Sequence, residues 1–150
     1  DLDLSRAVMV CTFNRPEAVC PILLDRMARI TVAGYSVADK LAIARRHLLP
    51  ELLEAYGLAP GDLQFDDDTL RAVMALVGDE PGVRALRRGL DAVVSGLNLC
   101  RVMRLDPLSG APRAAPLALP VAVTRDLVRR FLKPHEGTAG MSESARRMYL

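Results

Sequence analysis

The chain has 150 residues, of which 51% are apolar and 25% are charged, so its composition is that of a globular domain large enough to bury a core. A net charge of +2, with three Phe, three Tyr and no Trp, disfavours a nucleic-acid surface built on stacked aromatic rings. The three cysteines lack the spacing of a disulfide framework or a zinc site, and no apolar run approaches the roughly 20 residues that cross a bilayer, so no membrane partner is expected.

The N-terminal residues carry the pattern of an α/β region. Residues 7–13 form a continuous apolar run, which predicts a strand buried on both faces of a parallel sheet. Asn14 follows, where a functional residue at the end of a sheet strand would lie, although an ordinary turn residue is the alternative. Pro21 predicts the start of a helical turn, and residues 29–33 predict an edge strand. Because the start is acidic and has no initiator Met, we expect a piece of a longer chain.

Helical patterns dominate the rest of the chain. Ser36 and Asp39 form a predicted capping box, and apolar residues at four-residue steps then predict a helix. Pro50 lacks the N–H that the helical ladder requires, so it is predicted to end or kink this helix. One or two further turns follow and are closed by Gly57, and residues 63–65 are predicted to be extended.

Three more helices are predicted, over residues 69–77, 82–105 and 125–132. Three consecutive aspartates precede the first of them, at Asp66, Asp67 and Asp68. We favour a capping role for these aspartates over a cation site, because the spaced oxygens of a calcium loop are missing. The glycines of the long helix, Gly89 and Gly96, indicate close helix approach. A loop is predicted over residues 109–116, and a strand over residues 117–123 with Pro120 at a sheet edge.

Arg84 is the first candidate binding residue. It lies in the first turn of the longest predicted helix, beside an apolar stripe at alternating three- and four-residue steps. A guanidinium near the free N–H groups of a helix start is well placed to meet an anion such as a phosphate. The alternative, which this stretch alone favours, is a solvated arginine that covers the core with its apolar stem.

The common catalytic signatures are absent from the sequence. No G-x-x-x-x-G-K-[ST] loop, G-x-S-x-G turn or H-E-x-x-H pair is present. His47 and His135 are the only histidines, and a structural role is the favoured interpretation for His47 within its helix. Cys11 and Cys20 are expected to be buried thiols rather than nucleophiles.

Several runs of the sequence resemble the Lon protease family in order and spacing. They are Asp3-Leu4-Ser5, Thr12-Phe13-Asn14, Leu23-Leu24-Asp25-Arg26-Met27, Gly34-Tyr35, Lys40-Leu41-Ala42-Ile43-Ala44-Arg45-Arg46-His47-Leu48-Leu49-Pro50 and Gly82-Val83-Arg84. The resemblance covers residues 3–105 and continues more weakly over 121–132. The chain departs from the family at Gly78-Asp79-Glu80-Pro81, where Thr-Arg-Glu-Ala is usual, at Arg87, where Glu is usual, and in a long loop over 107–116.

The resemblance implies a fold that is mostly α with a small β component. It is the small helical lid subdomain of an AAA+ ATPase module, a helical bundle with a short parallel or mixed edge sheet. Residues 1–33 are expected to be the C-terminal remnant of the large α/β subdomain, and residues 34–134 the lid. Residues 135–150 are expected to form a tail or a linker towards a missing protease domain.

The same resemblance implies roles for three residues. Asn14 occupies the sensor-1 position, which helps to orient the attacking water, and Arg26 the position of an arginine finger that reaches the γ-phosphate in a neighbouring subunit. Arg84 occupies the sensor-2 position and would contact the nucleotide phosphates in its own subunit. Phosphoryl transfer depends on such fixed positive charges. The implied cofactor is ATP with Mg in the longer parent, and no metal-binding residue is assigned in this chain.

The function that the resemblance implies is that of a fragment of an ATP-dependent serine protease. Its parent would form a ring of identical subunits, expected to be a hexamer, that unfolds and degrades protein substrates in the bacterial cytoplasm or the mitochondrial matrix. The fragment alone is expected to be inactive. The alternative is the lid of a non-proteolytic AAA+ ATPase that acts as an interaction or assembly module. DNA binding is the third candidate.

Overall fold

The computed structural model describes residues 6–132 of the chain. The chain divides into two compact units, Asp1–Ala33 and Gly34–Leu150, and each is described here by itself. The predicted tail over 135–150 lies outside the described residues. No helix within residues 6–132 combines the length and the apolarity that crossing a membrane requires.

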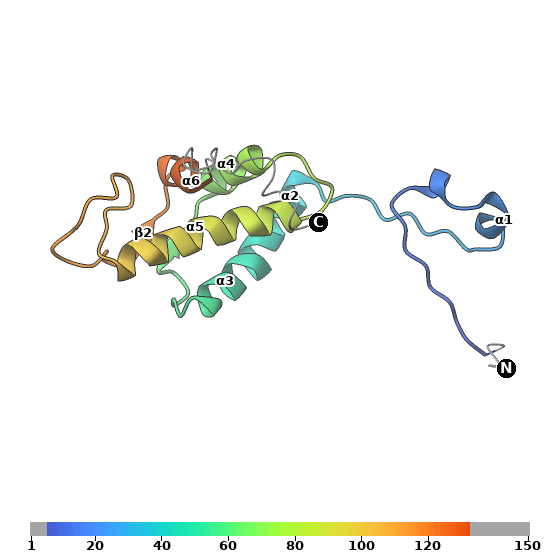
Figure 1. Cartoon of the computed structure of the whole chain (residues 1–150), viewed down its shortest axis with the longest axis horizontal. Helices are drawn as coiled ribbons and strands as arrows, with labels where there is room; N and C mark the ends of the chain where they lie inside the picture. Colours follow the sequence, from blue (N-terminus) through green and yellow to red (C-terminus); the bar gives the residue numbers. More distant parts are fainter. Residues whose placement is uncertain (1–5, 133–150) are drawn as a thin grey trace, which may run out of the picture. The chain divides into compact units, whose positions relative to one another are not determined.

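The first unit, drawn in blue in Figure 1, contains little regular structure. A single 3-10 turn, η1 (Pro16–Ala18), is followed by the short helix α1 (Pro21–Leu24), which starts at Pro21 as predicted. The prediction of strands over 7–13 and 29–33 is wrong, because both stretches are irregular. Strands need neighbours to accept their ladder hydrogen bonds, and the described part of this unit offers no paired strand; Val8 and Val10 are therefore 90% and 85% exposed.

The second unit begins with a continuous helix of three parts, α2 (Val37–Ile43), the π-helical turn η2 (Ala44–Leu48) and α3 (Leu49–Ala55). The predicted capping box is confirmed at its start. The Asp39 N–H donates to Ser36 Oγ over 3.2 Å, and the Ser36 N–H donates to Asp39 Oδ2 over 3.0 Å. These hydrogen bonds pair two of the N–H groups that a helix start leaves open.

Pro50 does not end this helix. The helix passes through Pro50 because the preceding turn is widened, so that the Leu49 N–H donates to the Ala44 carbonyl five residues back. A widened turn accommodates the missing N–H and the bulk of the proline ring without breaking the ladder. The predicted end at Gly57 is confirmed, since Gly57 has a φ of 66° and the Leu58 N–H donates to the Leu53 carbonyl over 2.8 Å.

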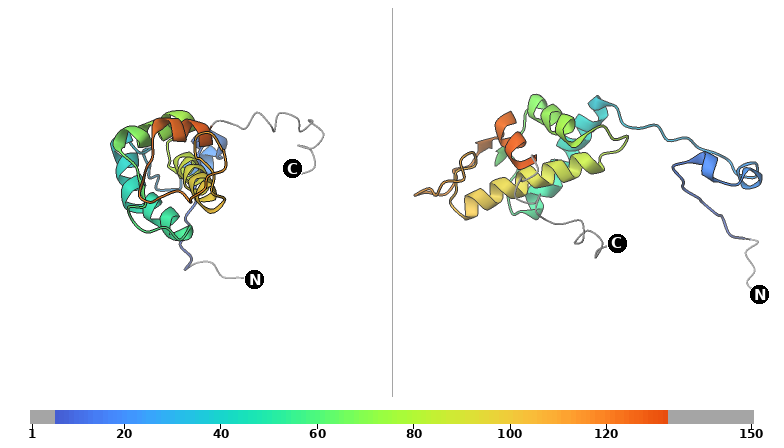
Figure 2. Two further views of the ribbon diagram at one scale, coloured as in Figure 1. Left: turned by 90° about the vertical axis from the view of Figure 1, so that its left-hand side faces the viewer. Right: turned by 45° about the horizontal axis from the view of Figure 1, so that its top comes forward.

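Three further helices lie in the described part of this unit, α4 (Asp67–Val77), α5 (Arg84–Val102) and α6 (Arg125–Leu132). Figures 1 and 2 show α5 as the central helix, with α4 and α6 side by side against it and the α2–α3 helix on another side. The hydrophobic core forms around α5, from side chains that include Leu48, Leu52, Leu70, Leu90, Leu97 and Val128. The predicted close approaches are confirmed: a Cβ on Gly89 would lie 2.5 Å from Val77 Cγ1, and one on Gly96 would collide with the Phe131 ring.

The sheet is a single parallel pair, β1 (Leu63–Gln64) with β2 (Val121–Ala122). The predicted fold class, mostly α with a small β component, is confirmed. The strand predicted over 117–123 is shorter than expected, because its partner offers only two residues to pair with. A buried threonine joins this sheet to α4, since Thr69 Oγ1 donates to the Val123 carbonyl over 3.0 Å.

The long helix ends earlier than predicted, at Val102 rather than near residue 105. Arg104 takes the left-handed conformation with a φ of 53°, and the Leu105 N–H donates to the Cys100 carbonyl over 2.8 Å. This is the arrangement of a glycine-terminated helix with an arginine in the glycine position, so the usual sequence signal for the helix end is missing. The loop that follows is organised by Asp106, which accepts hydrogen bonds from the N–H groups of Leu108 and Ser109.

Candidate functional site

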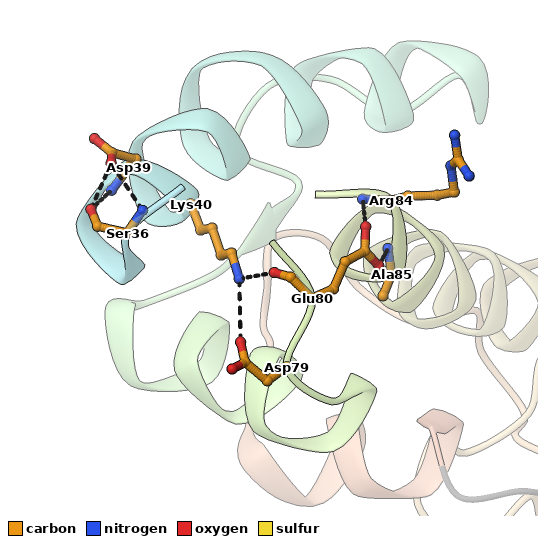
Figure 3. Close-up of polar contacts among 7 residues, drawn as sticks. All are labelled: Ser36, Asp39, Lys40, Asp79, Glu80, Arg84 and Ala85. Carbon is orange, nitrogen blue, oxygen red and sulfur yellow. Dashed lines mark hydrogen bonds and ion pairs between the residues drawn. The ribbon is translucent and has the colours of Figure 1, made fainter. Parts of the chain in front are cut away.

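The start of α5 is capped by a carboxylate from the preceding loop. Glu80 Oε1 accepts a hydrogen bond from the Arg84 N–H over 2.9 Å, and Glu80 Oε2 accepts one from the Ala85 N–H over 2.8 Å (Figure 3). The first N–H groups of a helix have no partner within it, and the local dipole favours negative charge there. Two of the main-chain donors that could have met an anion are thus paired internally, which leaves the Arg84 side chain as the charged group available to do so.

Arg84 itself is exposed, as the first residue of α5. Figure 3 shows its side chain pointing away from Lys40 and from the Glu80 carboxylate that pairs its own N–H. Among the contacts of the described residues, its guanidinium forms no ion pair. An unpaired guanidinium at the start of a fixed helix can bind a phosphate oxygen through its planar fork of donors.

The loop before α5 is held from the start of α2. The Lys40 side chain is only 12% exposed, and its Nζ donates to the Glu80 carbonyl and lies 3.8 Å from Asp79 Oδ1. Nearby, the Tyr35 N–H donates to the Pro81 carbonyl over 2.9 Å. Beside these contacts an open groove of about 430 Å³ runs between α2 and α4. It is lined by Val37, Lys40, Arg71, Met74, Ala75, Gly78 and Asp79. Arg84 does not line this groove.

The other two predicted site residues lie in the first unit. Asn14 is exposed in a bend just before η1, and Arg26 is exposed in the turn after α1. The structure places Asn14 and Arg26 within the first unit and Arg84 within the second. The roles of all three residues therefore stay predictions. The cysteines of the same unit, Cys11 and Cys20, are exposed, which corrects the prediction that they are buried. The cause is again the irregular chain, which packs them against no core.

The acidic start of α4 confirms the predicted capping role. Asp66 Oδ1 accepts a hydrogen bond from the Thr69 N–H over 2.6 Å, and this contact lowers the pKa of the Asp66 carboxyl. The two aspartates that follow form ion pairs, Asp67 with Arg45 and Asp68 with Arg125. Within the described residues, no three His, Cys, Asp or Glu side chains converge as a metal site would require.

Two polar residues of the candidate site escaped prediction from the sequence. Glu80 carries a local signal, a carboxylate four residues before the first helical residue, but the two glycines and the proline around it point only to a loop. Lys40 carries no local signal, because it binds a main-chain carbonyl 40 residues away.

Two further reactive side chains lie outside the candidate site. His47 is exposed on η2, and Cys100 is buried, which raises the pKa of its thiol.

Comparisons with known proteins give consistent similarities. No protein-family model matches the chain. The chain is 35% identical over 130 residues to a Lon protease of Aquifex aeolicus (strain VF5), which covers 87% of this chain and 15% of that protein. It is 42% identical over 108 residues to the peroxisomal Lon protease homolog 2 of Danio rerio, covering 72% of this chain and 12% of that protein. The corresponding protein of Pongo abelii is 32% identical over 142 residues, covering 95% and 16%. The chain spans less than one fifth of the length of these relatives.

Proposed function

This chain belongs to the Lon protease family, and on that premise we propose that it is the nucleotide-sensing lid part of a Lon-like ATP-dependent protease. The observation that supports this proposal most strongly is the exposed Arg84 at the capped start of the central helix, whose guanidinium forms no ion pair within residues 6–132. A charge held at the end of a rigid helix can respond to a phosphate and transmit that response to the whole helix. In this role Arg84 binds the phosphates of ATP in its own subunit.

The residues of this chain fit a nucleotide only in part. Arg84 offers a guanidinium suited to phosphate, but the N–H groups of Arg84 and Ala85 are already paired with Glu80. We propose that the magnesium ligands and the main phosphate-binding loop lie in other parts of the parent protein. ATP with Mg supplies the phosphoryl group when bound, and this chain supplies positioned positive charge.

Two further roles complete the proposal. Asn14 orients the attacking water as sensor 1, and Arg26 acts in trans as the arginine finger of a neighbouring subunit. Both side chains are exposed, as these roles require. A finger supplied in trans needs a ring of identical subunits, which we propose to be a hexamer acting on unfolded protein substrates. Loss of Arg26 should therefore lower the ATPase rate strongly, since an arginine finger contributes a factor of roughly 10³ to 10⁵ to kcat.

The relatives favour the protease over the non-proteolytic alternative, because they carry the name Lon protease. They include peroxisomal proteins, a compartment that the sequence did not suggest, alongside the Aquifex protein. We therefore propose a bacterial cytoplasm or a peroxisome as the compartment. The mitochondrial matrix has no support among these relatives.

The test compares two arginines of one helix in the longer protein that contains this chain. Arg84→Ala should lower the ATPase kcat at least about tenfold, because a phosphate contact is lost. Arg88→Ala is the matched control: Arg88 is exposed one turn further along α5, and its loss should leave kcat within about twofold. Unchanged ATPase activity in Arg84→Ala would contradict the proposed function.

A further inference from the structure

Lys40 lines the groove, yet its ammonium group turns to the loop before α5 and donates to the Glu80 carbonyl. Its side chain is 12% exposed, so its ammonium is largely withdrawn from water, which is costly unless the charge is paired. The Asp79 carboxylate is fully exposed and 3.8 Å away, so this ion pair contributes little. The main partner of the Lys40 Nζ is therefore the Glu80 carbonyl.

The loop that contains Glu80 makes a second contact, with Gly34 and Tyr35 at the start of the second unit. The Tyr35 N–H donates to the Pro81 carbonyl over 2.9 Å. Gly34 lies so close to Pro81 that an added Cβ would stand 3.1 Å from the Pro81 carbonyl oxygen. Gly34 is also the residue at which the second unit begins. Tyr35 and Lys40 thus bind the carbonyls of two successive residues, Pro81 and Glu80.

Glu80 connects the loop contact made by Lys40 to the start of α5. Its carbonyl accepts from Lys40, while its carboxylate accepts from the N–H groups of Arg84 and Ala85. Glu80 therefore joins α2 on one side to the first turn of α5 on the other (Figure 3), and Pro81, the next residue, binds the Tyr35 N–H. The contacts from Arg84 to Tyr35 thus run through two hydrogen-bonded residues that are neighbours in the chain, Glu80 and Pro81.

We propose that Lys40 is a positioning residue for Arg84, and that the loop it holds at Glu80 and Pro81 couples the first turn of α5 to Gly34 and Tyr35. The coupling part of this inference rests on the proposed nucleotide-sensing function, whereas the positioning part concerns this chain alone. When Arg84 binds a phosphate, the first turn of α5 shifts, and Glu80 and Pro81 transmit this shift to Gly34 and Tyr35 at the start of the second unit.

The positioning role is tested by amide hydrogen exchange on the chain itself. In Lys40→Met, the amides of Arg84 and Ala85 should exchange about tenfold faster, because their carboxylate acceptor loses its anchor. The amide of Leu90 should be unchanged. Lys40→Arg should restore protection, since a guanidinium also donates to the carbonyl. Arg71→Met is the control, because Arg71 lines the same groove but pairs with Asp68.

Two outcomes would overturn the positioning role. Exchange at Arg84 and Ala85 that does not respond to Lys40→Met would show that Lys40 does not hold the cap. Faster exchange along all of α5, including Leu90, would show a general loss of stability instead.

The coupling role is tested by ATPase kinetics in the longer protein. Lys40→Met should lower the ATPase kcat, the quantity that Arg84→Ala lowers, by up to about tenfold, and Lys40→Arg should restore it, while adding Lys40→Met to Arg84→Ala should change nothing further. If Arg84→Ala impairs the ATPase but Lys40→Met does not, the coupling is wrong and the proposed function stands. If Arg84→Ala has no effect, the proposed function and the coupling are both wrong, and the exchange experiment still decides the positioning role.

Discussion

The two ends of α5 are stabilised in opposite ways. Its start is capped by the side chain of Glu80, which is anchored in turn by Lys40 from a distant helix. Its end is closed by main-chain hydrogen bonds alone, with Arg104 in a left-handed conformation and Met103 61% exposed. The start is therefore sensitive to the rest of the molecule, whereas the end is a local structure. A helix with one coupled end and one local end can respond to a signal at the coupled end.

Among substitutions at the two ends of α5, Glu80→Ala is expected to change the free energy of unfolding most. The substitution leaves the N–H groups of Arg84 and Ala85 without acceptors, so it should lower the free energy of unfolding by about 1–2 kcal/mol. Hydrogen exchange should show the loss at the start of α5, with the amide of Leu105 unaffected. Glu80→Gln is the matched control and should lose less, because one acceptor oxygen remains. Equal loss at both ends would contradict the distinction between them.

A smaller effect of opposite sign is expected at the other end. Arg104→Gly should raise the free energy of unfolding by about 0.5–1 kcal/mol, because glycine adopts a φ of 53° without a steric cost. Urea denaturation measures the change. Arg101→Gly, placed three residues earlier within the helix, should be destabilising instead. A destabilised Arg104→Gly would show that the arginine side chain contributes more than its strained backbone costs.

The smallest effect is expected in acid. Hydrogen bonds from Ser36 and from Ser109 lower the pKa values of the exposed carboxyls of Asp39 and Asp106, respectively. Because the folded pKa lies below the unfolded one, this stabilisation is present above the unfolded value near 3.8 and is lost as the pH falls through the folded value. Asp39→Asn should flatten the loss of thermal stability below pH 4. A stability profile identical to that of the unaltered chain would refute this assignment.

The elements that the sequence predicted correctly carry their signals locally. The Ser36–Asp39 cap, the helix end at Gly57 and the capped start of α4 all follow from residues within a few positions of one another. The close approaches at Gly89 and Gly96 could also be predicted, because a glycine inside an otherwise regular helix needs a reason.

What the sequence could not predict depends on distant partners or on their absence. The apolar run 7–13 has a strand pattern, but no described strand lies beside it to complete a ladder. The end of α5 has an arginine where glycine is usual, and the helix passes Pro50 through a widened turn that no single residue announces. In the candidate site, Arg84 is predicted from the family resemblance, because its helix position alone favours a solvated arginine, and its role stays a prediction. Lys40 could not be predicted, because its acceptor is a main-chain atom that any residue would provide.

The most direct test of the central claim is hydrogen exchange of the longer protein with and without ATP, read separately at the two ends of α5. If Arg84 reports the nucleotide, ATP should slow exchange at Arg84, Ala85 and Tyr35, while exchange at Met103 and Leu105 stays the same. Exchange at the start of α5 that does not respond to ATP, or an equal response at both ends, would contradict the account.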